Sequence, residues 1–547
     1  MSMKHMAYME EFYNDLAKFH EMTEKFYRKE ITIPEYKHFS GGFGSYAQRG
    51  GGSSMLRMRL TGGEISREIL GFLSDSIEKY KISLAHLTTC QSLQLHNLNE
   101  AQVCALIQEA FDHGIITRGG GGDYPRNVMA SPLSGVLPGE PFDVLPYAKE
   151  AADYLLGFIN TVTLPRKLKV CFSNSPVDEV HAAFRDLGFV ATKDGAFDVY
   201  CAGGLGRSPR MGLKVAAGVA PSHILYHIKA MVDTFTAYGN YENRGRARTR
   251  FLQEELGPEG LLAAYQEKLA AAQASEDLTL TAARASQEPT LAAARASQEP
   301  ALAPRTIDAA PSSPGAAGAA KSGHGVLTHP RAIPQKQPGL YAVFYKPAGG
   351  NVPVERFRQL FNAMADMEGT ALRLSPAQCL YIINCTAREA ETLIDLTPDS
   401  ARSTFELSMA CIGAGICQVG ARDSQATLKA CLEAVRPFDF PDGTLPPLRI
   451  SGCPSSCSAH QVAPLGFRGG VCQTPEGPRP AYALYAGGCE LPGQEQFGEE
   501  LGVLPEACMP DFLVELGTAI AADHSTYERW IAENQEHFLE LIRKYSA

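Results

Sequence analysis

Apolar side chains alternate with polar ones in segments that occur twice along the chain, in the same order. Residues 55–66 (MLRMRLTGGEIS) and 341–353 (YAVFYKPAGGNVP) each predict an alternating strand, a Gly-Gly turn and the start of a helix. Residues 87–97 (LTTCQSLQLHN) and 374–384 (LSPAQCLYIIN) each predict the strand that returns beside it. The pattern therefore places one small strand-rich unit in each part of the chain.

Three further blocks match between the same two parts. They are 164–173 (LPRKLKVCFS) with 445–454 (LPPLRISGCP), 186–189 (DLGF) with 464–467 (PLGF), and 199–204 (VYCAGG) with 484–488 (LYAGG). Five matched blocks in one order indicate an internal duplication. Each copy is predicted to hold a small α+β unit followed by a larger α/β unit, so the expected fold class is α+β with two pseudo-symmetric halves.

A segment of different composition separates the two copies. Residues 259–328 are rich in Ala, Gln, Ser, Glu and Pro, and AARASQEP occurs at 282–289 and again at 293–300. We expect a flexible linker with a helical first part; a helical hairpin packed on the body is the alternative. The expected organisation is 1–120 (N-terminal helix and first small unit), 121–258 (first large unit), 259–328 (linker), 329–400 (second small unit) and 401–547 (second large unit).

Composition and charge narrow the classes of partner. Of the 547 residues, 45% are hydrophobic and 20% are charged, which is typical of a globular protein, and the formal net charge is -10. Nucleic-acid binding depends on neutralising phosphates, so this balance argues against a nucleic-acid partner. Residues 1–10 do not resemble a signal peptide, and no apolar run approaches the ~18 residues of a membrane helix. We expect a cytoplasmic protein without a membrane partner.

Four of the 14 cysteines form a spaced set. Cys411 and Cys417 make a C-x5-C, and Cys453 and Cys457 make a C-x3-C that begins 36 residues after Cys417. Four thiolates on two loops suit a [4Fe-4S] cubane, which takes one cysteine per iron. A structural zinc site, which favours shorter C-x2-4-C spacings, and four unrelated buried cysteines remain the alternatives.

C-x5-C followed by G-C-P-x-x-C resembles the signature of the siroheme- and [4Fe-4S]-dependent nitrite/sulfite reductase family. The resemblance extends over most of the chain outside the linker and the first ~35 residues, a stretch that predicts a helix. It implies a ferredoxin-like small unit in each half and a siroheme at the interface of the halves. It also implies that Cys411, Cys417, Cys453 and Cys457 hold the cluster, and that Cys457 joins the cluster to the siroheme iron.

The same resemblance points to four cations over the siroheme: Arg57, Arg126, Lys167 and Lys169. A small oxyanion that gains negative charge during reduction needs fixed positive charge and proton donors, which Arg and Lys supply. Lys167 and Lys169 are two residues apart in a predicted strand and would share one face. In the second copy, Val343 is expected near the place of Arg57, and Leu448 and Ile450 near the places of the two lysines. Only the first copy would then form the anion site.

Siroheme carries eight carboxylates, so its pocket should be rich in Arg, Lys and other donors. The candidates for this cradle are Gln91, Gln94, His96, Arg207 and Arg210. Two positions depart from the family pattern. Cys90 stands where the family usually has an arginine, and Ser455 stands where it usually has an asparagine.

The resemblance implies an oxidoreductase that reduces sulfite to sulfide with six electrons, with ferredoxin or a similar small carrier as the donor. Lys-x-Lys at 167–169 favours sulfite, because nitrite-type members tend to have Lys-x-Asn there. The alternatives are a ferredoxin-dependent nitrite reductase that forms ammonia, an enzyme like precorrin-3B synthase, and a siroheme protein that only carries electrons or cofactor.

Overall fold

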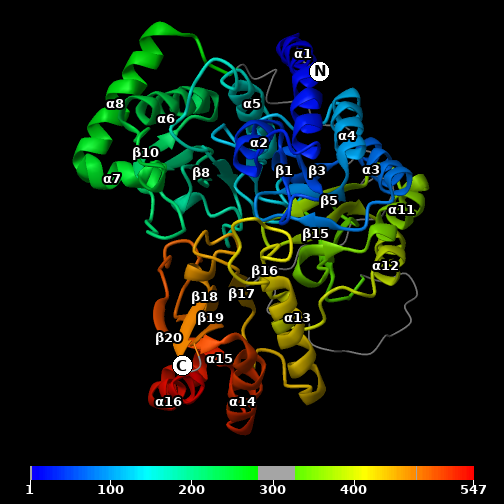
Figure 1. Ribbon diagram of the computed structural model, residues 1–547, viewed down its shortest axis with the longest axis vertical. Coiled ribbons are helices and arrows are strands. Elements are labelled where there is room, and N and C mark those ends of the chain that lie inside the picture. The colour runs from blue at the N-terminus through cyan, green and yellow to red at the C-terminus, as the bar shows by residue number, and fades with distance from the viewer. Residues whose placement is uncertain (1–2, 281–326, 476) are drawn as a thin grey trace.

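The computed structural model describes residues 3–280, 327–475 and 477–547, and four five-stranded sheets form its body (Figure 1). Most of the expected linker, including both AARASQEP repeats, lies outside the described residues. The expected N-terminal helix is confirmed as α1 (Met3–Tyr27), and α2 (Ile33–Ser40) follows it. Among the described helices, none combines the length and the apolar character needed to cross a membrane.

The two small sheets exchange a strand between the copies. The first sheet runs β1 (Ser45–Ala47), β2 (Ser54–Arg59), β5 (Ser92–Leu98), β4 (Ala85–Leu87) and then β13 (Asn351–Val352) from the second copy. The second runs β11 (Ala332–Pro334), β12 (Tyr341–Tyr345), β15 (Cys379–Cys385), β14 (Ala371–Ser375) and then β3 (Glu64–Ile65) from the first copy. Because each sheet ends on the other copy's strand, the two small units share one apolar core, in which Leu56, Leu95, Val343 and Ile382 are buried.

Corresponding helices cover the two small sheets. They are α3 (Arg67–Tyr80) and α4 (Glu100–Asp112) in the first copy, and α11 (Val354–Ala363) and α12 (Ala387–Leu396) in the second. The helix after the returning strand starts in the same way in both copies. Asn99 with Gln102 and Thr386 with Glu389 form capping boxes, which satisfy the first free N–H groups of α4 and α12.

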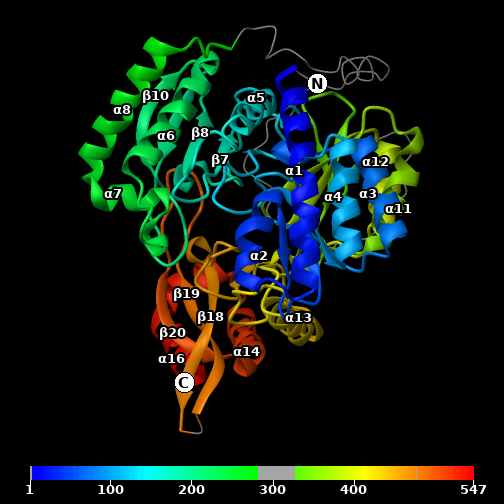
Figure 2. The same ribbon diagram turned by 45° about the horizontal axis from the view of Figure 1, so that its top comes forward.

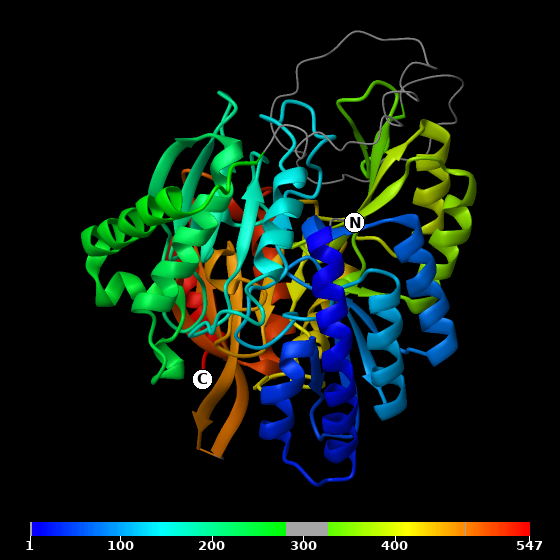
Figure 3. The same ribbon diagram turned by 90° about the horizontal axis from the view of Figure 1, so that it is seen from above.

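The two large sheets have the same topology, with three parallel strands followed by two antiparallel ones. The first comprises β6 (Met129–Ala130), β7 (Val170–Ser173), β8 (Leu187–Ala191), β9 (Phe197–Cys201) and β10 (Leu213–Val219). The second comprises β16 (Met409–Ala410), β17 (Leu448–Ser451), β18 (Leu465–Thr474), β19 (Gly477–Ala486) and β20 (Glu499–Pro505). The long β18–β19 hairpin projects from the body (Figures 2 and 3). The expected α+β class with two similar halves is confirmed.

Helices also accompany each large sheet. The first copy has α5 (Leu145–Leu156), α6 (Ile224–Tyr238), α7 (Leu252–Glu255) and α8 (Gly257–Ser275), and the second has α13 (Ser424–Val435), α14 (Met509–Ala522), α15 (Tyr527–Glu533) and α16 (Gln535–Tyr545). The start of the expected linker is thus the helix α8. Its Leu261, Tyr265 and Leu269 are buried in the core of the first large unit, and Nδ1 of His227 in α6 lies 3.0 Å from the Tyr265 hydroxyl. Residues 257–275 are therefore part of the folded body.

Strand register corrects two details of the expected duplication. Val170 pairs with Leu187 and Leu448 pairs with Leu465, so Val170 corresponds to Leu448. The expected alignment of 164–173 with 445–454 is therefore wrong by three residues, and Leu445 and Pro447 take the places of Lys167 and Lys169. Those places are still apolar in the second copy.

The counterpart of Arg57 shifts by one residue for the same reason. Arg57 pairs with Gln94, and Phe344 pairs with Tyr381, so Phe344 and not Val343 takes the place of Arg57. This position too is apolar in the second copy. The contrast between a cationic first copy and an apolar second copy therefore holds at both corrected positions.

Candidate active site

Segments beside the parallel strands of both large sheets meet the first small sheet and the β14–β15 turn around one cavity. The volume of this cavity is about 320 Å3. Among the described residues that line it, eight are arginines or lysines: Arg57, Arg59, Arg126, Lys167, Lys169, Arg185, Arg248 and Arg449. Three lining residues are carboxylates: Glu179, Asp186 and Glu490. A chain with a net charge of -10 has thus gathered cations at one place, which concentrates anions there.

Arg57 and Arg126 are held against the same backbone carbonyl. Nη1 of each donates to the oxygen of Gly120 at 2.8 Å, and Nη2 of Arg126 donates to the oxygen of Gly122 at 2.9 Å. With its amide oxygen turned toward Arg57, Gln94 accepts from Nε of Arg57 at 2.9 Å. Burial lowers the pKa of Arg126 to about 10, so the side chain stays charged at neutral pH. Two fixed guanidinium groups therefore face the cavity from one side.

Lys167 and Lys169 flank the buried Leu168 in an extended segment that precedes β7, so the expected strand starts three residues later than Lys167. Both lysines line the cavity, as their shared face requires. Burial, together with Lys169 and nearby arginines, places the pKa of Lys167 well below its ordinary value. At Lys169 the neighbouring Cys90 favours the charged form, but burial and Arg185 outweigh it and lower the pKa.

Cys90 lies among these cations. Burial alone would raise the pKa of its thiol, but Lys169, Arg185 and Lys167 more than offset this and bring the pKa to about 6. A thiolate at this position partly balances the positive charge of the cavity. The sequence pattern marked Cys90 only as a departure and did not indicate its ionisation.

The four spaced cysteines all line the cavity. Cys411 follows β16 directly, and Cys453 and Cys457 lie in the turn after β17. The thiol of Cys411 accepts a hydrogen bond from the amide of Gly452 at 3.2 Å. Cys457 is exposed to the space of the cavity, but the surrounding protein shields it from bulk water. This burial, together with Cys411 and Cys453, raises the pKa of its thiol to about 12. A metal or cluster cation bound there would favour the thiolate form of these ligands.

No group of three or more described His, Cys, Asp or Glu side chains is placed to hold a single metal ion. A cubane makes a different demand, because each of its four irons takes one thiolate and the sulfurs surround a common space. The first copy helps to hold the loop of this set. The amide of Arg49 donates to the oxygen of Ile416 at 2.8 Å, and Nη2 of Arg49 donates to the oxygen of Cys417 at 3.2 Å.

The first copy has other residues at the places of three of the four spaced cysteines. The strand registers put Ser131, Ser175 and Glu179 at the positions of Cys411, Cys453 and Cys457. The hydroxyl of Ser131 accepts from the amide of Asn174 at 3.1 Å, as the thiol of Cys411 accepts from Gly452.

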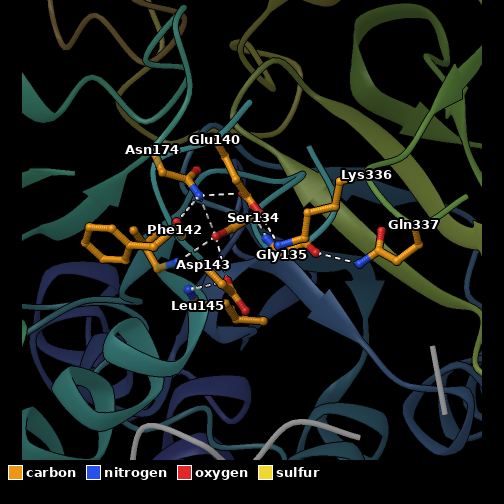
Figure 4. A network of polar contacts seen from close by, with 10 residues as sticks. Ser134, Gly135, Glu140, Phe142, Asp143, Leu145, Asn174, Lys336 and Gln337 are labelled. Carbon is orange, nitrogen blue, oxygen red and sulfur yellow. Dashed lines mark hydrogen bonds and ion pairs between the residues drawn. The ribbon is translucent and has the colours of Figure 1, made fainter. Parts of the chain in front are cut away.

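A polar network fills the corresponding loop of the first copy (Figure 4). The side-chain amide of Asn174 donates to the hydroxyl of Ser134 at 2.9 Å and to a carboxylate oxygen of Glu140 at 2.7 Å. Lys336 from the second copy pairs with Glu140 at 2.8 Å. The first copy thus has the same loop, with internal hydrogen bonds where the second copy has thiols.

The predicted cradle residues separate into two groups. Gln94 lines the cavity, whereas Gln91, His96, Arg207 and Arg210 do not. Gln91 is fully buried and donates to backbone oxygens, and His96 is buried with its ring nitrogens 3.2 Å from Gln48 and Gln94. Arg207 is exposed, and Arg210 pairs with Glu254 at 2.8 Å. Gln91, His96 and Arg210 are thus held by contacts within the protein, although Cys90, Ser92 and Gly204 in the same segments line the cavity.

Several lining residues had no signal in the sequence: Arg59, Arg185, Arg248, Arg449, Glu179, His181 and Glu490. Glu179, His181 and Arg185 share the segment between β7 and β8, but the others come from distant parts of the chain, so no single local spacing connects the set. Arg248, for example, binds both oxygens of Asp186 at 2.9 Å, although 62 residues separate the two. Only the pairing of distant loops could have identified this ion pair.

The cavity contains donors that the described protein residues leave unused. Nε of Arg126, Nε of Arg248 and Nη1 of Arg449 are buried without a hydrogen-bond partner. Buried donors are nearly always paired in native proteins, so these call for an acceptor that the chain does not provide. A cofactor with many carboxylates fits this set, and four thiolates at the same cavity fit a cubane.

Comparison with known protein families supports the same kind of site. Residues 121–272 match the nitrite and sulphite reductase 4Fe-4S domain, and residues 46–110 match the nitrite/sulfite reductase ferredoxin-like half domain. Both matches lie in the first copy, whereas the spaced cysteines lie in the second. The order of the two matched domains is the order that the duplication predicts.

Similar proteins extend the likeness over most of the chain. The chloroplastic ferredoxin–nitrite reductase of Zea mays is 27% identical over 453 residues, which are 78% of this chain and 71% of that protein. A sulfite reductase (ferredoxin) of Mycobacterium tuberculosis is 24% identical over 431 residues, 76% of this chain and 69% of that protein. The solved structure of the Mycobacterium tuberculosis NirA protein has the same fold, with a TM-score of 0.74, 22% identity, and coverage of 93% of this chain and 92% of that one. The chain therefore contains a ferredoxin-like half domain at 46–110 and a 4Fe-4S domain at 121–272 of the kind found in nitrite and sulfite reductases.

Proposed function

We propose that this protein reduces sulfite to sulfide with six electrons at a siroheme coupled to a [4Fe-4S] cluster, and that reduced ferredoxin or a similar carrier is the donor. One observation carries the proposal. The four cysteines of the second copy and the cations Arg57, Arg126, Lys167 and Lys169 of the first copy line one cavity. Relatives that act on nitrite and on sulfite support the class of reaction.

In this proposal Cys411, Cys417, Cys453 and Cys457 would hold the cluster, and Cys457 would also be the residue shared with the siroheme. When bound, the coupled cofactors supply electrons one at a time. The chain's own residues do the remaining work. Arg57 and Arg126 bind the oxygens of the anion through permanent charges, and their shared hold on Gly120 fixes their orientation. Lys167 and Lys169 add positive charge and pass protons to the oxygens that leave as water.

The preference for sulfite rests on Lys169, the second lysine of the Lys-x-Lys segment. It supports the larger and more highly charged anion with one more cation than an asparagine would give. Reduction of nitrite to ammonia is the second candidate, because a nitrite reductase is among the similar proteins. Both reactions take six electrons, so the number of electrons does not separate the two candidates.

The test compares the two anions on anaerobically purified protein. Reduced methyl viologen serves as donor, and sulfide and ammonia are measured to obtain kcat/KM for each anion. A higher kcat/KM for sulfite is expected, and a higher value for nitrite would replace the sulfite proposal with the nitrite one. Siroheme-loaded protein that forms neither product would contradict the reductase proposal and leave the carrier or precorrin-3B synthase-like alternatives.

A further inference from the structure

Four polar side chains, joined one to the next by hydrogen bonds, form a row across the cavity from the first copy to the second. Nη2 of Arg185 lies 3.3 Å from Nδ1 of His181, and Nε2 of His181 lies 2.6 Å from Oε2 of Glu490. Oε1 of Glu490 accepts from Nη2 of Arg449. All four residues line the cavity, and Arg185 and His181 belong to the first copy, Glu490 and Arg449 to the second.

The chemistry of the four side chains fixes the direction of each hydrogen bond in this row. A guanidinium group only donates, so Nδ1 of His181 accepts from Arg185. The proton of a neutral imidazole is then on Nε2, which donates to Glu490. Burial lowers the pKa of His181 to about 4, and the carboxylate of Glu490 is stabilised by Arg449 and His181 despite its burial, with a pKa of about 2. At neutral pH the four side chains of this row therefore comprise two cations, one anion and one neutral ring.

The charges of these four side chains do not cancel one another. Glu490 can neutralise only one of the two guanidinium groups, and the buried Lys346 adds a further cation next to Arg449. Glu179 is the other carboxylate near Glu490, but burial raises its pKa and so disfavours its charged form. The thiolate of Cys90 near Arg185 is shared with Lys169 and Lys167. An excess of buried positive charge is costly unless an anion accompanies it. The excess thus indicates a bound anion at this end of the cavity.

Arg449 has a free donor for such an anion. Its side chain is 14% exposed, and Nη1 is buried with no hydrogen-bond partner among the described residues. Nη2 is already fixed by Glu490, so the plane of the guanidinium group is set before any ligand arrives. A carboxylate is the planar acceptor that suits a guanidinium edge.

We propose that Arg185 and Arg449, one from each copy, bind acidic side chains of the tetrapyrrole, and that His181 and Glu490 are positioning residues that hold the two arginines in place. This inference rests on the proposed function and names the residues of each copy that bind the siroheme. The second copy then contributes a cation to a cofactor site whose other cations come from the first copy.

The experiment measures how tightly the purified holoenzyme holds siroheme. Protein from a host that makes siroheme is diluted, and the loss of siroheme absorbance is followed beside iron content and thermal unfolding. Arg449→Met should release siroheme roughly 10–100-fold faster than the wild type, the range expected for lost supporting contacts at a cofactor. Glu490→Gln should give a smaller increase, because the amide still accepts one hydrogen bond but carries no charge. Arg449→Lys should recover part of the retention, since the charge remains without the fork.

Arg356→Met is the matched control, because Arg356 is 11% exposed and pairs with Asp399 at 2.8 Å but does not line the cavity. It should leave the dissociation rate unchanged. If Arg449→Met does not fold, Arg185→Met provides the same test from the first copy. Siroheme-bearing wild-type protein with unchanged release in the folded arginine variant would overturn this inference alone. Wild-type protein that takes up no siroheme would overturn the proposed function and the inference with it.

Discussion

Gln91 and Gln378 occupy the same position in the two copies, and each joins its own copy to the other. Both have a left-handed backbone, with φ of 50° and 59°. Nε2 of Gln91 donates to the oxygens of Ala130 and Leu374, each at 2.8 Å. Nε2 of Gln378 donates to the oxygen of Ala410 at 2.8 Å and, at 3.4 Å, to the end of β4. The two glutamines thus fasten both large units to the exchanged small sheets.

Replacing either glutamine with alanine should lower the free energy of unfolding by about 1–3 kcal/mol, because buried carbonyl oxygens lose their donor. Urea unfolding followed by circular dichroism measures the change. Gln108→Ala is the control, since Gln108 is partly exposed on α4 and donates only to Asp112. A loss at Gln91 no larger than at Gln108 would mean that the buried hydrogen bonds contribute little.

Gly466 permits the close approach that shapes the loop of Cys453 and Cys457. A Cβ at this glycine would lie 1.9 Å from the backbone oxygen of His460, whereas a Cβ at Gly470 would meet nothing within 4 Å. Gly466→Ala should therefore destabilise the protein by about 1–3 kcal/mol through overpacking and should lower its iron content. Gly470→Ala serves as the control on the same strand. Equal iron content in the two variants would argue against this role.

Cys90 should react as a thiolate at unusually low pH. Its pKa of about 6 means that half of the thiol is ionised near pH 6, and that alkylation slows as the pH falls below this value. Lys169→Gln removes the largest favourable charge and should shift the midpoint to higher pH. The rate of iodoacetamide modification at Cys90, located by peptide mass spectrometry in siroheme-free protein, gives the profile. A midpoint of about 8.5, the value of an ordinary thiol, would contradict the cationic setting.

Lys169→Asn should change the preference between the two anions. Loss of one positive charge should cost the sulfite reaction more than the nitrite reaction, and the ratio of kcat/KM should fall by about 10-fold, which corresponds to about 1.4 kcal/mol. Lys336→Asn, at a lysine that is 42% exposed and paired with Glu140, is the control. An unchanged ratio would show that Lys169 does not set the specificity.

The sequence by itself determined the features that depend on short spacing or repetition. The alternating segments and the matched blocks revealed the duplication, and the α+β class follows from them. The spacing of Cys411, Cys417, Cys453 and Cys457 indicated a metal-cluster set because its members lie on two short loops. Lys167 and Lys169 share a face because only one residue separates them. Each of these relations is local, so it can be read without knowing how the chain packs.

The tertiary structure alone decided which distant loops meet. Gln91 looked like a cofactor residue, but packing turned its amide toward three backbone segments. Arg185 and Arg449 come from different copies, 264 residues apart in the numbering, and the contact of His181 with Glu490 joins their two segments at one cavity. The exact match of the copies also needed strand register, because the shared Leu-Pro at 164–165 and 445–446 suggests an alignment that differs by three residues from the one that the strands adopt. Such contacts depend on the free energy of packing the whole chain, which no local pattern contains.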